Sequence, residues 1–482
     1  MNRKVNQIIF FGFIFHVFAA IFSIGHHHCD ELFQIFEFAG YKLGLNQADQ
    51  LPWEFSAQMR SGLQPFLVYV ITHLCQHAGL HNPFHVAVVI RLLQAVFSFY
   101  VMLRFIHVLS QYHDFNKSPQ SLYFFAFLFW CMPYFHARFS SENFSSALFF
   151  FGLSLLIDAK AKHKSSNFLF GGLFFGLAFI VRFQIGFMLA GYIAWMLFVQ
   201  KVDLKKISLI FSGIFTALIL GFLCDYWLYG TPVCSWWNYL HENVFQNKAG
   251  EFGTSPFYFY FIESFVQLIP PFSLLIIFAV LIYFIKNPKS VFTWLAVPFI
   301  ILHIVVPHKE LRFLFPLLYL LPVFMAAFFQ YIGSKNESKL VAFFTSGAFI
   351  KTALIINGVL LLVFSFKPAD DETQLFHTIY NVVGSQPSTL FYEARNPYNN
   401  QAGLNYFRSK QVHCIELYKD SVIDLSRPNY FFRDGFHKEM FVVKNTKVFV
   451  KVYANLPDWI DRFNFSGWLQ RANSYCIYKE VK

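Results

Sequence analysis

The chain has 482 residues, of which 56% are hydrophobic, only 13% are charged and 68 are phenylalanine. One or two soluble cores could not bury this much apolar surface, so the composition excludes an ordinary soluble protein and indicates a polytopic membrane protein. The net charge of +11 comes from Lys and Arg residues spread over short loops. That distribution favours contact with membrane lipids over nucleic acid, and no nucleic-acid partner is expected.

About 11 apolar stretches approach the ~20 residues that a helix needs to cross a bilayer. They are residues 8–24, 85–109, 121–136, 144–157, 168–183, 184–199, 207–228, 271–285, 290–306, 313–332 and 341–366. An N-terminus placed inside brings the lysine-rich loops to the same inner side, as the positive-inside rule requires, provided that residues 66–80 do not span. His73, Gln76 and His77 interrupt that stretch, so we expect it to lie along the outer surface.

This topology gathers the unusual polar segments of the chain on the outer face. They are the loops 25–64 and 229–270, the junction 137–143 and the segment 308–312. The inner loops carry little besides lysine, serine and asparagine, so we expect the outer face to hold the functional site.

After residue 366 the apolar runs shorten, and the alternating stretches 439–443 and 447–453 predict strands. We therefore expect an all-α transmembrane domain at residues 1–366 and a small, soluble, mixed α/β domain at residues 367–482 on the outer, lumenal or periplasmic, side. Cys414 and Cys476 could pair there if that compartment is oxidising.

The segment His308-Lys309-Glu310-Leu311-Arg312-Phe313 lies between two long apolar runs. It is short and carries an imidazole, an ammonium, a carboxylate and a guanidinium. Such a group at a membrane boundary indicates a functional site. The structural alternative is a helix end, where Lys309 and Arg312 snorkel to headgroups and Glu310 pairs with one of them.

In the first outer loop Asp30, Gln34 and Glu37 recur at helical spacing, and Glu31 adjoins Asp30. A carboxylate at the membrane boundary can act as general base on a sugar hydroxyl. Acids in the first turn of a helix are the structural alternative. The preceding histidines, residues 26–28, are typical metal ligands, but adjacent side chains cannot all point one way, so we expect no metal.

Further along the same loop, Trp53 and Glu54 are followed by Arg60. An aromatic face with a carboxylate suits a sugar ring, and arginine suits phosphate. A tryptophan at this depth is equally an ordinary membrane-interface residue.

These motifs resemble, in the same order from about residue 26 to 330, the mannosyltransferases that build GPI anchors and lipid-linked N-glycan precursors (glycosyltransferase family 22). The matching elements are Cys29-Asp30-Glu31-x-x-Gln34-x-x-Glu37, Trp53-Glu54-Phe55 with Arg60-Ser61-x-x-x-Pro65, Arg138 to Asn143, Asp225 to Gly250 and His308-Lys309-Glu310-x-Arg312-Phe313. The last of these is the most specific. The chain departs from the family pattern at Cys29, Phe55 and Phe183, which concerns the acceptor more than the reaction.

The resemblance implies a GT-C membrane fold and an inverting enzyme. Such an enzyme moves mannose from a polyprenyl (dolichyl) phosphate donor to a lipid-linked glycan acceptor, such as a GPI precursor or an oligosaccharide lipid. It would lie in the ER membrane of a eukaryote or the inner membrane of a bacterium. No metal or other cofactor is implied, because positioned cations can stabilise the departing lipid phosphate.

By the same resemblance Asp30 is the general base, and Glu31 orients it or the acceptor. The residues implied to bind the donor phosphate are His308, Lys309, Arg312 and Arg182. Those implied to support the site or bind the acceptor are Glu310, Gln34, Glu37, Trp53, Glu54, Arg60, Arg138, Asn143, Asp225 and Asn247.

Two alternatives stay open at this stage. A buried Arg182–Asp225 pair that joins two helices would explain both residues without a function. A transporter or flippase of lipid-linked glycans is the alternative of a different class, and it predicts midplane charges, broken helices and two similar halves. Arg91 is one interior charge, but the halves do not repeat.

Overall fold

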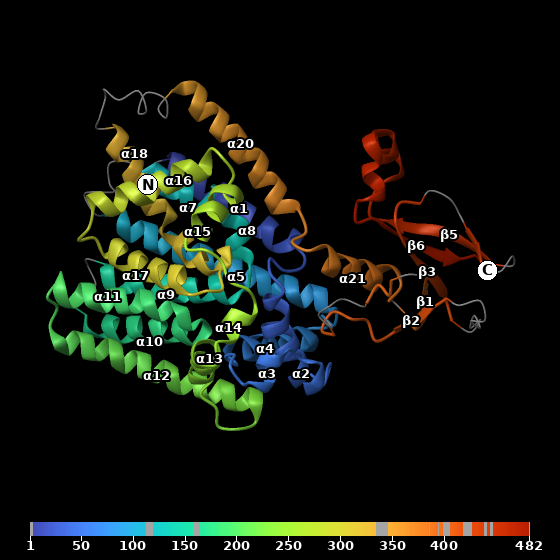
Figure 1. The fold of residues 1–482 in the computed structure, drawn as a ribbon, viewed down its shortest axis with the longest axis horizontal. Helices are drawn as coiled ribbons and strands as arrows, with labels where there is room; N and C mark the ends of the chain where they lie inside the picture. Colours follow the sequence, from blue (N-terminus) through green and yellow to red (C-terminus); the bar gives the residue numbers. More distant parts are fainter. Residues whose placement is uncertain are drawn as a thin grey trace.

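The computed structural model describes residues 3–111, 119–158, 164–333, 346–384, 386–393, 395–398, 405–417, 427–437, 441–443 and 447–481. A helical body forms the larger part, and a smaller unit built around a sheet lies beside it (Figure 1). The helix α21 (Asp371–Val382) lies between the two in Figure 1. The expected fold class, a helical membrane protein with a small C-terminal α/β domain, is confirmed.

Among the described residues, five helical segments are long and apolar enough to cross a membrane. They are α1 (Arg3–Phe22), α5 (Pro83–Leu109), α12 (Leu204–Tyr229), η5 with α18 (Leu311–Leu320 and Leu321–Gly333) and α20 (Gly347–Phe366). A sixth candidate is the pair α16 (Phe272–Lys286) and α17 (Val291–Val305), which is bent by 118°. The chain is therefore an integral membrane protein, but helix length and composition do not confirm the expected count of about 11 spans.

Several expected spans are short or broken in the structure. The shorter apolar helices are α9 (Ser141–Ile157), α10 (Ser165–Val181) and η3 with α11 (Phe183–Ile185 and Gly186–Phe198). The expected span 121–136 divides into α7 (Pro119–Phe127) and α8 (Met132–Ala137). The Asn357 side chain stabilises this break, because it accepts from the Trp130 amide at 3.0 Å and donates to the Leu128 carbonyl at 2.8 Å.

The other helices of the larger part are shorter and lie within residues 32–77 and 235–267. They are η1 (Leu32–Phe36), α2 (Glu37–Lys42), η2 (Ala48–Gln50), α3 (Trp53–Ser56), α4 (Leu63–His77), α13 (Ser235–Leu240), η4 (His241–Phe245), α14 (Lys248–Glu251) and α15 (Phe259–Gln267). Glycines let these segments and the body pack closely. A Cβ on Gly62 would lie 2.3 Å from the Cys224 carbonyl oxygen, so the first loop rests directly on the end of α12.

The smaller unit contains a six-stranded mixed sheet in the order β2-β1-β3-β6-β5-β4. Its strands are β1 (Ser388–Tyr392), β2 (Val412–Glu416), β3 (Asn429–Asp434), β4 (Phe441–Val443), β5 (Lys447–Ala454) and β6 (Tyr475–Glu480). The short helices η6 (Asp458–Phe463) and η7 (Phe465–Gln470) lie between β5 and β6 in the chain. β1 pairs in parallel with β2 and β3, and the other pairings are antiparallel. The predicted strands are confirmed at 441–443 and 447–453, whereas residues 439–440 lie outside the described residues.

The possible disulfide between Cys414 and Cys476 does not form. Cys414 lies on β2 and Cys476 on β6, and both are free thiols. The strands β1 and β3 lie between β2 and β6 in the sheet, which at ~4.8 Å per strand already places β2 and β6 roughly 14 Å apart. A disulfide needs its two Cα atoms within about 7 Å, so this sheet order excludes the pair.

Residues of the first loop connect the two units. Glu37 accepts hydrogen bonds from the Tyr406 amide at 2.9 Å and from the Asn46 side chain at 2.7 Å. Thr72 on α4 contacts the Tyr406 hydroxyl at 3.0 Å. The helix α4 covers most of residues 66–80 and, with 15 residues, is not among the candidate spans. Glu37, expected near the acceptor, instead joins the loop to the C-terminal unit.

Candidate active site

Arg312, at the start of η5, brings together three carboxylates from distant parts of the chain. Its Nη2 donates to Asp30 Oδ2 at 2.7 Å, and its Nη1 donates to Glu142 Oε1 at 3.3 Å. Its Nε donates to Glu310 Oε2 at 2.5 Å. Arg182, which follows α10, joins the group through Glu142. We call Asp30, Glu142, Arg182, Glu310 and Arg312 the charged cluster.

Arg182 has hydrogen-bonding capacity that the described residues do not use. Its Nη1 donates to Glu142 Oε1 at 2.9 Å and to Ser141 Oγ at 3.1 Å, and its guanidinium lies 5.2 Å from the centre of the Phe313 ring. Its Nε and Nη2 are buried without a hydrogen-bond partner among the residues that the structure describes. A buried unsatisfied donor costs about 1–3 kcal/mol, so this guanidinium is suited to receive an anion such as phosphate.

The carboxylates of the cluster are held in their charged form. Burial alone would raise the pKa of Asp30, but the charge of Arg312 and a hydrogen bond with His28 hold it well below its usual range. Burial likewise opposes ionisation of Glu310, but the hydrogen bond and charge of Arg312 lower its pKa to about 2. Both groups are therefore carboxylates at neutral pH, as a general base or a cation partner must be.

His28 lies between two of these carboxylates. Its Nδ1 is 3.6 Å from Asp30 Oδ1, and its Nε2 is 3.3 Å from Glu310 Oε2. Burial lowers the pKa of His28, but hydrogen bonds with Asp30 and Cys29 outweigh this effect and raise the pKa to about 10. The imidazolium therefore adds a positive charge to the cluster at neutral pH.

This raised pKa predicts a specific pH dependence of stability. A group whose pKa rises on folding stabilises the fold fully below its unfolded pKa of 6.5 and loses that contribution as the pH rises through its folded pKa of about 10. We expect the melting temperature of the wild type to exceed that of His28→Gln at pH 6.5 and the difference to shrink towards pH 10. Thermal unfolding in detergent at several pH values measures this. A difference that stays constant over that range would contradict the raised pKa.

Glu31 points away from the charged cluster although it adjoins Asp30. Its Oε2 lies 3.9 Å from Arg138 Nη1, and its Oε1 accepts from the His27 amide at 3.2 Å. Burial raises the pKa of Glu31, and the charge of Arg138 opposes that rise. Arg138 also donates to the carbonyls of Ser23 and Gly25, both at 2.8 Å, so it fixes the end of α1 where the site begins.

An apolar cavity of about 740 Å³ begins at this point. Its polar end contains His27, Glu31 and Arg138. The rest is lined by apolar side chains of α8, α15, α16, α17, η5 and α20, among them Phe135, Phe261, Val280, Ile304, Leu314 and Phe364. An elongated apolar chain with a polar head is the kind of ligand that suits such a lining.

Within the segment His308-Lys309-Glu310-Leu311-Arg312-Phe313, the basic side chains point in different directions. His308 Nε2 contacts Glu310 Oε1 at 2.9 Å, next to the charged cluster. Lys309 Nζ instead donates to the carbonyls of Val306, Ser255 and Pro307 at 2.7, 2.9 and 3.4 Å. Its three N–H groups thus all have acceptors, which leaves none for the expected phosphate. The structural alternative, in which Lys309 and Arg312 extend to lipid headgroups, is also wrong. Lys309 is buried, and Arg312 points inward to Asp30.

The other residues expected near the acceptor form a second group beside the cluster. Glu54 Oε1 accepts from Gln34 Nε2 at 3.3 Å and from Arg60 Nη2 at 3.4 Å. Arg60 and Gln34 also line a small cavity of about 30 Å³ together with Arg182. Trp53 stacks on Phe252 with ring centres 6.1 Å apart. Gln34 and Arg60 thus lie next to Arg182 at this small cavity, with Glu54 bound to both of them.

Besides Glu37 and Arg138, three further expected acceptor residues lie outside both groups. The Asn143 side chain joins helices by donating to the Arg138 carbonyl at 2.8 Å and accepting from the Tyr319 hydroxyl at 3.0 Å. Asp225 accepts from the Gly62 amide at 2.7 Å and from Ser235 Oγ at 2.5 Å. Because Arg182 pairs with Glu142, the alternative of an Arg182–Asp225 pair is wrong. Asn247 is exposed between η4 and α14 at a positive φ of 54°.

Two members of the site were missed as candidates from the sequence. Glu142 lies in the 137–143 junction. Its position as an ionisable residue in the first turn of an apolar helix could have marked it as a site residue. His28 was considered with its neighbours as a metal ligand. The structure brings ligand atoms of His28, Cys29 and Asp30 within 4.8 Å of one another, but Asp30 already receives Arg312, so a metal there would compete with that guanidinium.

This fold and this site define the class: an integral membrane protein of the GT-C type with a charged cluster at one end of its helices. The crystal structure of ArnT from Cupriavidus metallidurans bound to undecaprenyl phosphate has the same fold, with a TM-score of 0.53 and 10% sequence identity over 98% of this chain and 97% of that one. The model of the Alg9-like mannosyltransferase family matches residues 7–376, and the chain belongs to that family.

Two curated relatives are similar in sequence. Mannosyltransferase APTG1 of Arabidopsis thaliana is 25% identical over 351 residues, which are 69% of this chain and 61% of the relative. A probable Dol-P-Man:Man(7)GlcNAc(2)-PP-Dol alpha-1,6-mannosyltransferase of Schizosaccharomyces pombe is 31% identical over 155 residues, which are 31% of this chain and 27% of the relative. The matches thus cover less than two thirds of these relatives' lengths.

Proposed function

We propose that this protein transfers mannose, with inversion at the anomeric carbon, from a polyprenyl-phosphate mannose donor to a lipid-linked glycan acceptor. The observation that carries the proposal is the pair of Arg182 donors that lack a partner among the described residues. They belong to the same charged cluster as Asp30, to which Arg182 is linked through Glu142 and Arg312. Membership of the mannosyltransferase family supports mannose as the sugar. The name of the fission-yeast relative includes dolichyl-phosphate mannose, which supports this class of donor.

The donor phosphate lies against Arg182 in this proposal. Its Nε and Nη2 offer two parallel N–H groups, the geometry that binds a phosphate through two oxygens. Arg60 and Arg182 both line the cavity of about 30 Å³ described above. His308 lies beside Glu310 at the edge of the charged cluster. The phosphate gains negative charge as the sugar leaves, and fixed cations stabilise that charge more in the transition state than in the ground state. No metal is required for this step.

Asp30 acts as the general base. Its carboxylate takes the proton of an acceptor hydroxyl while the hydroxyl oxygen attacks the anomeric carbon from the face opposite the phosphate. The bond between that carbon and the phosphate oxygen breaks, and the polyprenyl phosphate leaves with the bonding electrons. The product therefore has the inverted configuration. Arg312 positions Asp30 and shares its charge with Glu142 and Glu310, so the base stays ionised and correctly placed.

The apolar cavity of about 740 Å³ holds the prenyl chain of a lipid-linked substrate. Its polar end at Glu31 and Arg138 adjoins Asp30 along the chain, so a headgroup emerging from it reaches the cluster. The ArnT crystal structure contains a bound undecaprenyl phosphate, which supports a lipid phosphate as a ligand class for this fold. The flippase alternative is not favoured, because the charged cluster lies at one end of the helices and the described pair at the other end of α9, Arg104 with Asp158, is more exposed.

Arg182→Lys tests the phosphate contact. Lysine keeps a positive charge near Glu142 but loses the two N–H groups that the described residues leave unused. Hydrogen bonds to charged groups contribute about 1.5–3 kcal/mol, so we expect the KM for the donor to rise roughly 10- to 100-fold while the KM for the acceptor changes little.

Arg104→Lys is the matched control, because Arg104 forms an ion pair with Asp158 at the other end of α9. Steady-state kinetics of both purified variants measure the two KM values. An unchanged donor KM in Arg182→Lys would place the phosphate elsewhere.

The site faces the lumenal or periplasmic side in this proposal, in the ER membrane of a eukaryote or the inner membrane of a bacterium. We expect single cysteines introduced at the exposed positions Gln50, Gln246 and Gln411 to react alike with an impermeant maleimide in sealed vesicles, and one at Lys205 to react only after permeabilisation. The seven native cysteines are replaced first. Equal labelling at Lys205 and the other three positions would contradict the orientation.

A further inference from the structure

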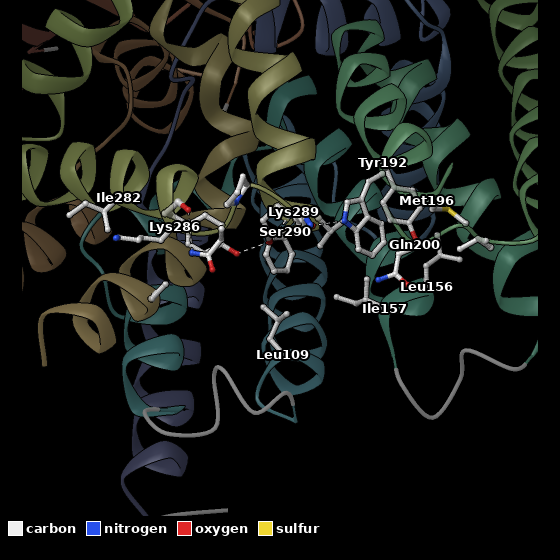
Figure 2. A pocket seen from close by; sticks show the side chains of 18 of the residues that line it. Leu109, Leu156, Ile157, Tyr192, Met196, Gln200, Ile282, Lys286, Lys289 and Ser290 are labelled. Atoms are coloured by element: carbon white, nitrogen blue, oxygen red, sulfur yellow. Dashed lines mark hydrogen bonds between the residues drawn. The ribbon is translucent and has the colours of Figure 1, made fainter. Parts of the chain in front are cut away.

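A second large cavity, of about 1030 Å³, lies among the helix ends far from the charged cluster. Figure 2 shows Ile282 and Lys286 on one side of it and Tyr192 and Gln200 on the other. Lys289 lies between these two sides in the same view. Most of the wall is apolar, but basic and amide side chains stand at its rim.

The helices themselves place this cavity opposite the site. α9 begins beside Glu142 of the charged cluster and lines the cavity with Ile157. At 1.5 Å per residue, these two positions are roughly 22 Å apart. α10 runs in the other direction, from Phe168 at the cavity to Arg182 at the cluster. A ligand bound here would therefore not touch the reacting groups.

The described charged residues that line the cavity are all positive. Lys206, Lys286 and Lys289 belong to its lining, and the described lining residues include no Asp or Glu. The ammonium groups of Lys206 and Lys286 each lie 5.5 Å from the centre of a lining aromatic ring, that of Phe168 and that of Tyr331. A basic pocket between transmembrane helices is suited to an anionic lipid headgroup.

The rim at residues 287–290, where α16 and α17 meet at their bend, is a fixed structure. The indole of Trp195 donates to the Lys289 carbonyl at 2.9 Å, and that of Trp294 donates to the Pro288 carbonyl at 3.1 Å. Ser290 Oγ contacts the Tyr283 hydroxyl at 2.8 Å. This part of the rim therefore does not need to be ordered by a ligand, which lowers the entropic cost of binding.

One polar group at the cavity lacks a partner. The side-chain amide nitrogen of Gln330, on α18, is buried and has no hydrogen-bond partner among the residues that the structure describes. A buried amide donor is costly unless something accepts its hydrogen bond. An anionic oxygen that enters between the lysines would meet this requirement.

We propose that this cavity binds one anionic phospholipid, with its charged headgroup in the field of Lys206, Lys286 and Lys289 and an acyl chain along the apolar wall. Charge complementarity favours an anionic lipid over a zwitterionic one, because the described lining has three ammonium groups and no carboxylate. The apolar wall selects it over free phosphate. The inference concerns a site separate from the proposed transfer reaction and does not depend on it.

Native mass spectrometry of the purified protein tests this directly. The wild type in detergent receives equal amounts of a phosphatidylglycerol and a phosphatidylcholine of the same chains, and inorganic phosphate is added in a separate sample. We expect one phosphatidylglycerol to be retained in preference to phosphatidylcholine, with inorganic phosphate unable to displace it. Each lysine near an anionic headgroup contributes about fivefold in affinity, so the triple variant Lys206→Ala, Lys286→Ala, Lys289→Ala is expected to bind it roughly a hundredfold more weakly.

Two further variants separate the cavity from general surface charge. The control triple Lys164→Ala, Lys201→Ala, Lys205→Ala removes the same charge from exposed positions outside the lining and should retain the bound lipid. Ala327→Phe keeps the lysines but fills part of the cavity and should lose the lipid. Melting temperatures establish that each variant is folded.

Four results would overturn the proposal. They are equal retention of the two lipids by the wild type, displacement of the lipid by inorganic phosphate, equal loss in the two triple variants, and full binding by a folded Ala327→Phe variant.

Discussion

Asp30→Asn is expected to lower the rate of mannosyl transfer by ~10²–10⁴-fold, the usual contribution of a general base. Asparagine keeps the shape of the side chain but cannot take a proton. The variant should still fold, because Arg312 retains Glu142 and Glu310 as partners. Transfer of radiolabelled mannose by purified protein, together with the melting temperature, measures both effects.

Glu31→Gln is the matched control for this base. Glu31 adjoins Asp30 but pairs with Arg138 and faces the apolar cavity, so its amide variant should lose less activity and should mainly affect the KM of a lipid-linked substrate. If Asp30→Asn stayed near wild-type activity while Glu31→Gln lost it, the base would be Glu31 and the proposed roles of the two acids would be exchanged.

Arg312→Ala is expected to destabilise the fold and to abolish transfer. Its removal leaves Asp30, Glu142 and Glu310 without the guanidinium that they share. Breaking a buried ion pair in this way typically costs about 3–5 kcal/mol. Arg312→Lys restores the charge but cannot contact Asp30, Glu142 and Glu310 at once. We therefore expect it to recover much of the melting temperature, while its activity stays at least ~10-fold below that of the wild type.

Arg104→Ala provides the comparison for stability. Arg104 also pairs with a carboxylate, Asp158, but at a more exposed position near the other end of α9, where an ion pair contributes about 0–1 kcal/mol. A loss of stability in Arg312→Ala no larger than in Arg104→Ala, as measured by thermal unfolding, would show that Arg312 does not hold the cluster together.

Composition and motif order were enough to predict the membrane class, the small α/β domain and the family resemblance. Interruptions inside apolar stretches were not predictable, because they depend on partners that are distant in sequence. The break between α7 and α8 illustrates this, since the side chain that stabilises it, Asn357, belongs to α20. A hydropathy profile detects the apolar residues of 121–136. It does not detect the Asn357 side-chain amide, which replaces helical hydrogen bonds at the break.

The candidate site shows the same limit at the level of single side chains. Asp30 and Arg312 were both candidates, but nothing in the sequence indicates that they touch across a separation of 282 positions. Lys309 and Arg312 belong to one motif, yet one is satisfied by backbone carbonyls and the other by carboxylates. The direction of each side chain depends on how η5 begins and on which loops pack against it, and the sequence pattern does not contain that information.

The most direct measurement is the stereochemistry of transfer by the purified, reconstituted protein. The assay supplies a polyprenyl-phosphate mannose of defined anomeric configuration and a lipid-linked glycan acceptor, with and without EDTA, and NMR determines the configuration of the new glycosidic bond. The account predicts a mannosylated acceptor of inverted configuration, formed at the same rate with and without the chelator and lost in Asp30→Asn. Retention of configuration, or transfer that stops with EDTA, would contradict a metal-free single displacement in which Asp30 is the base.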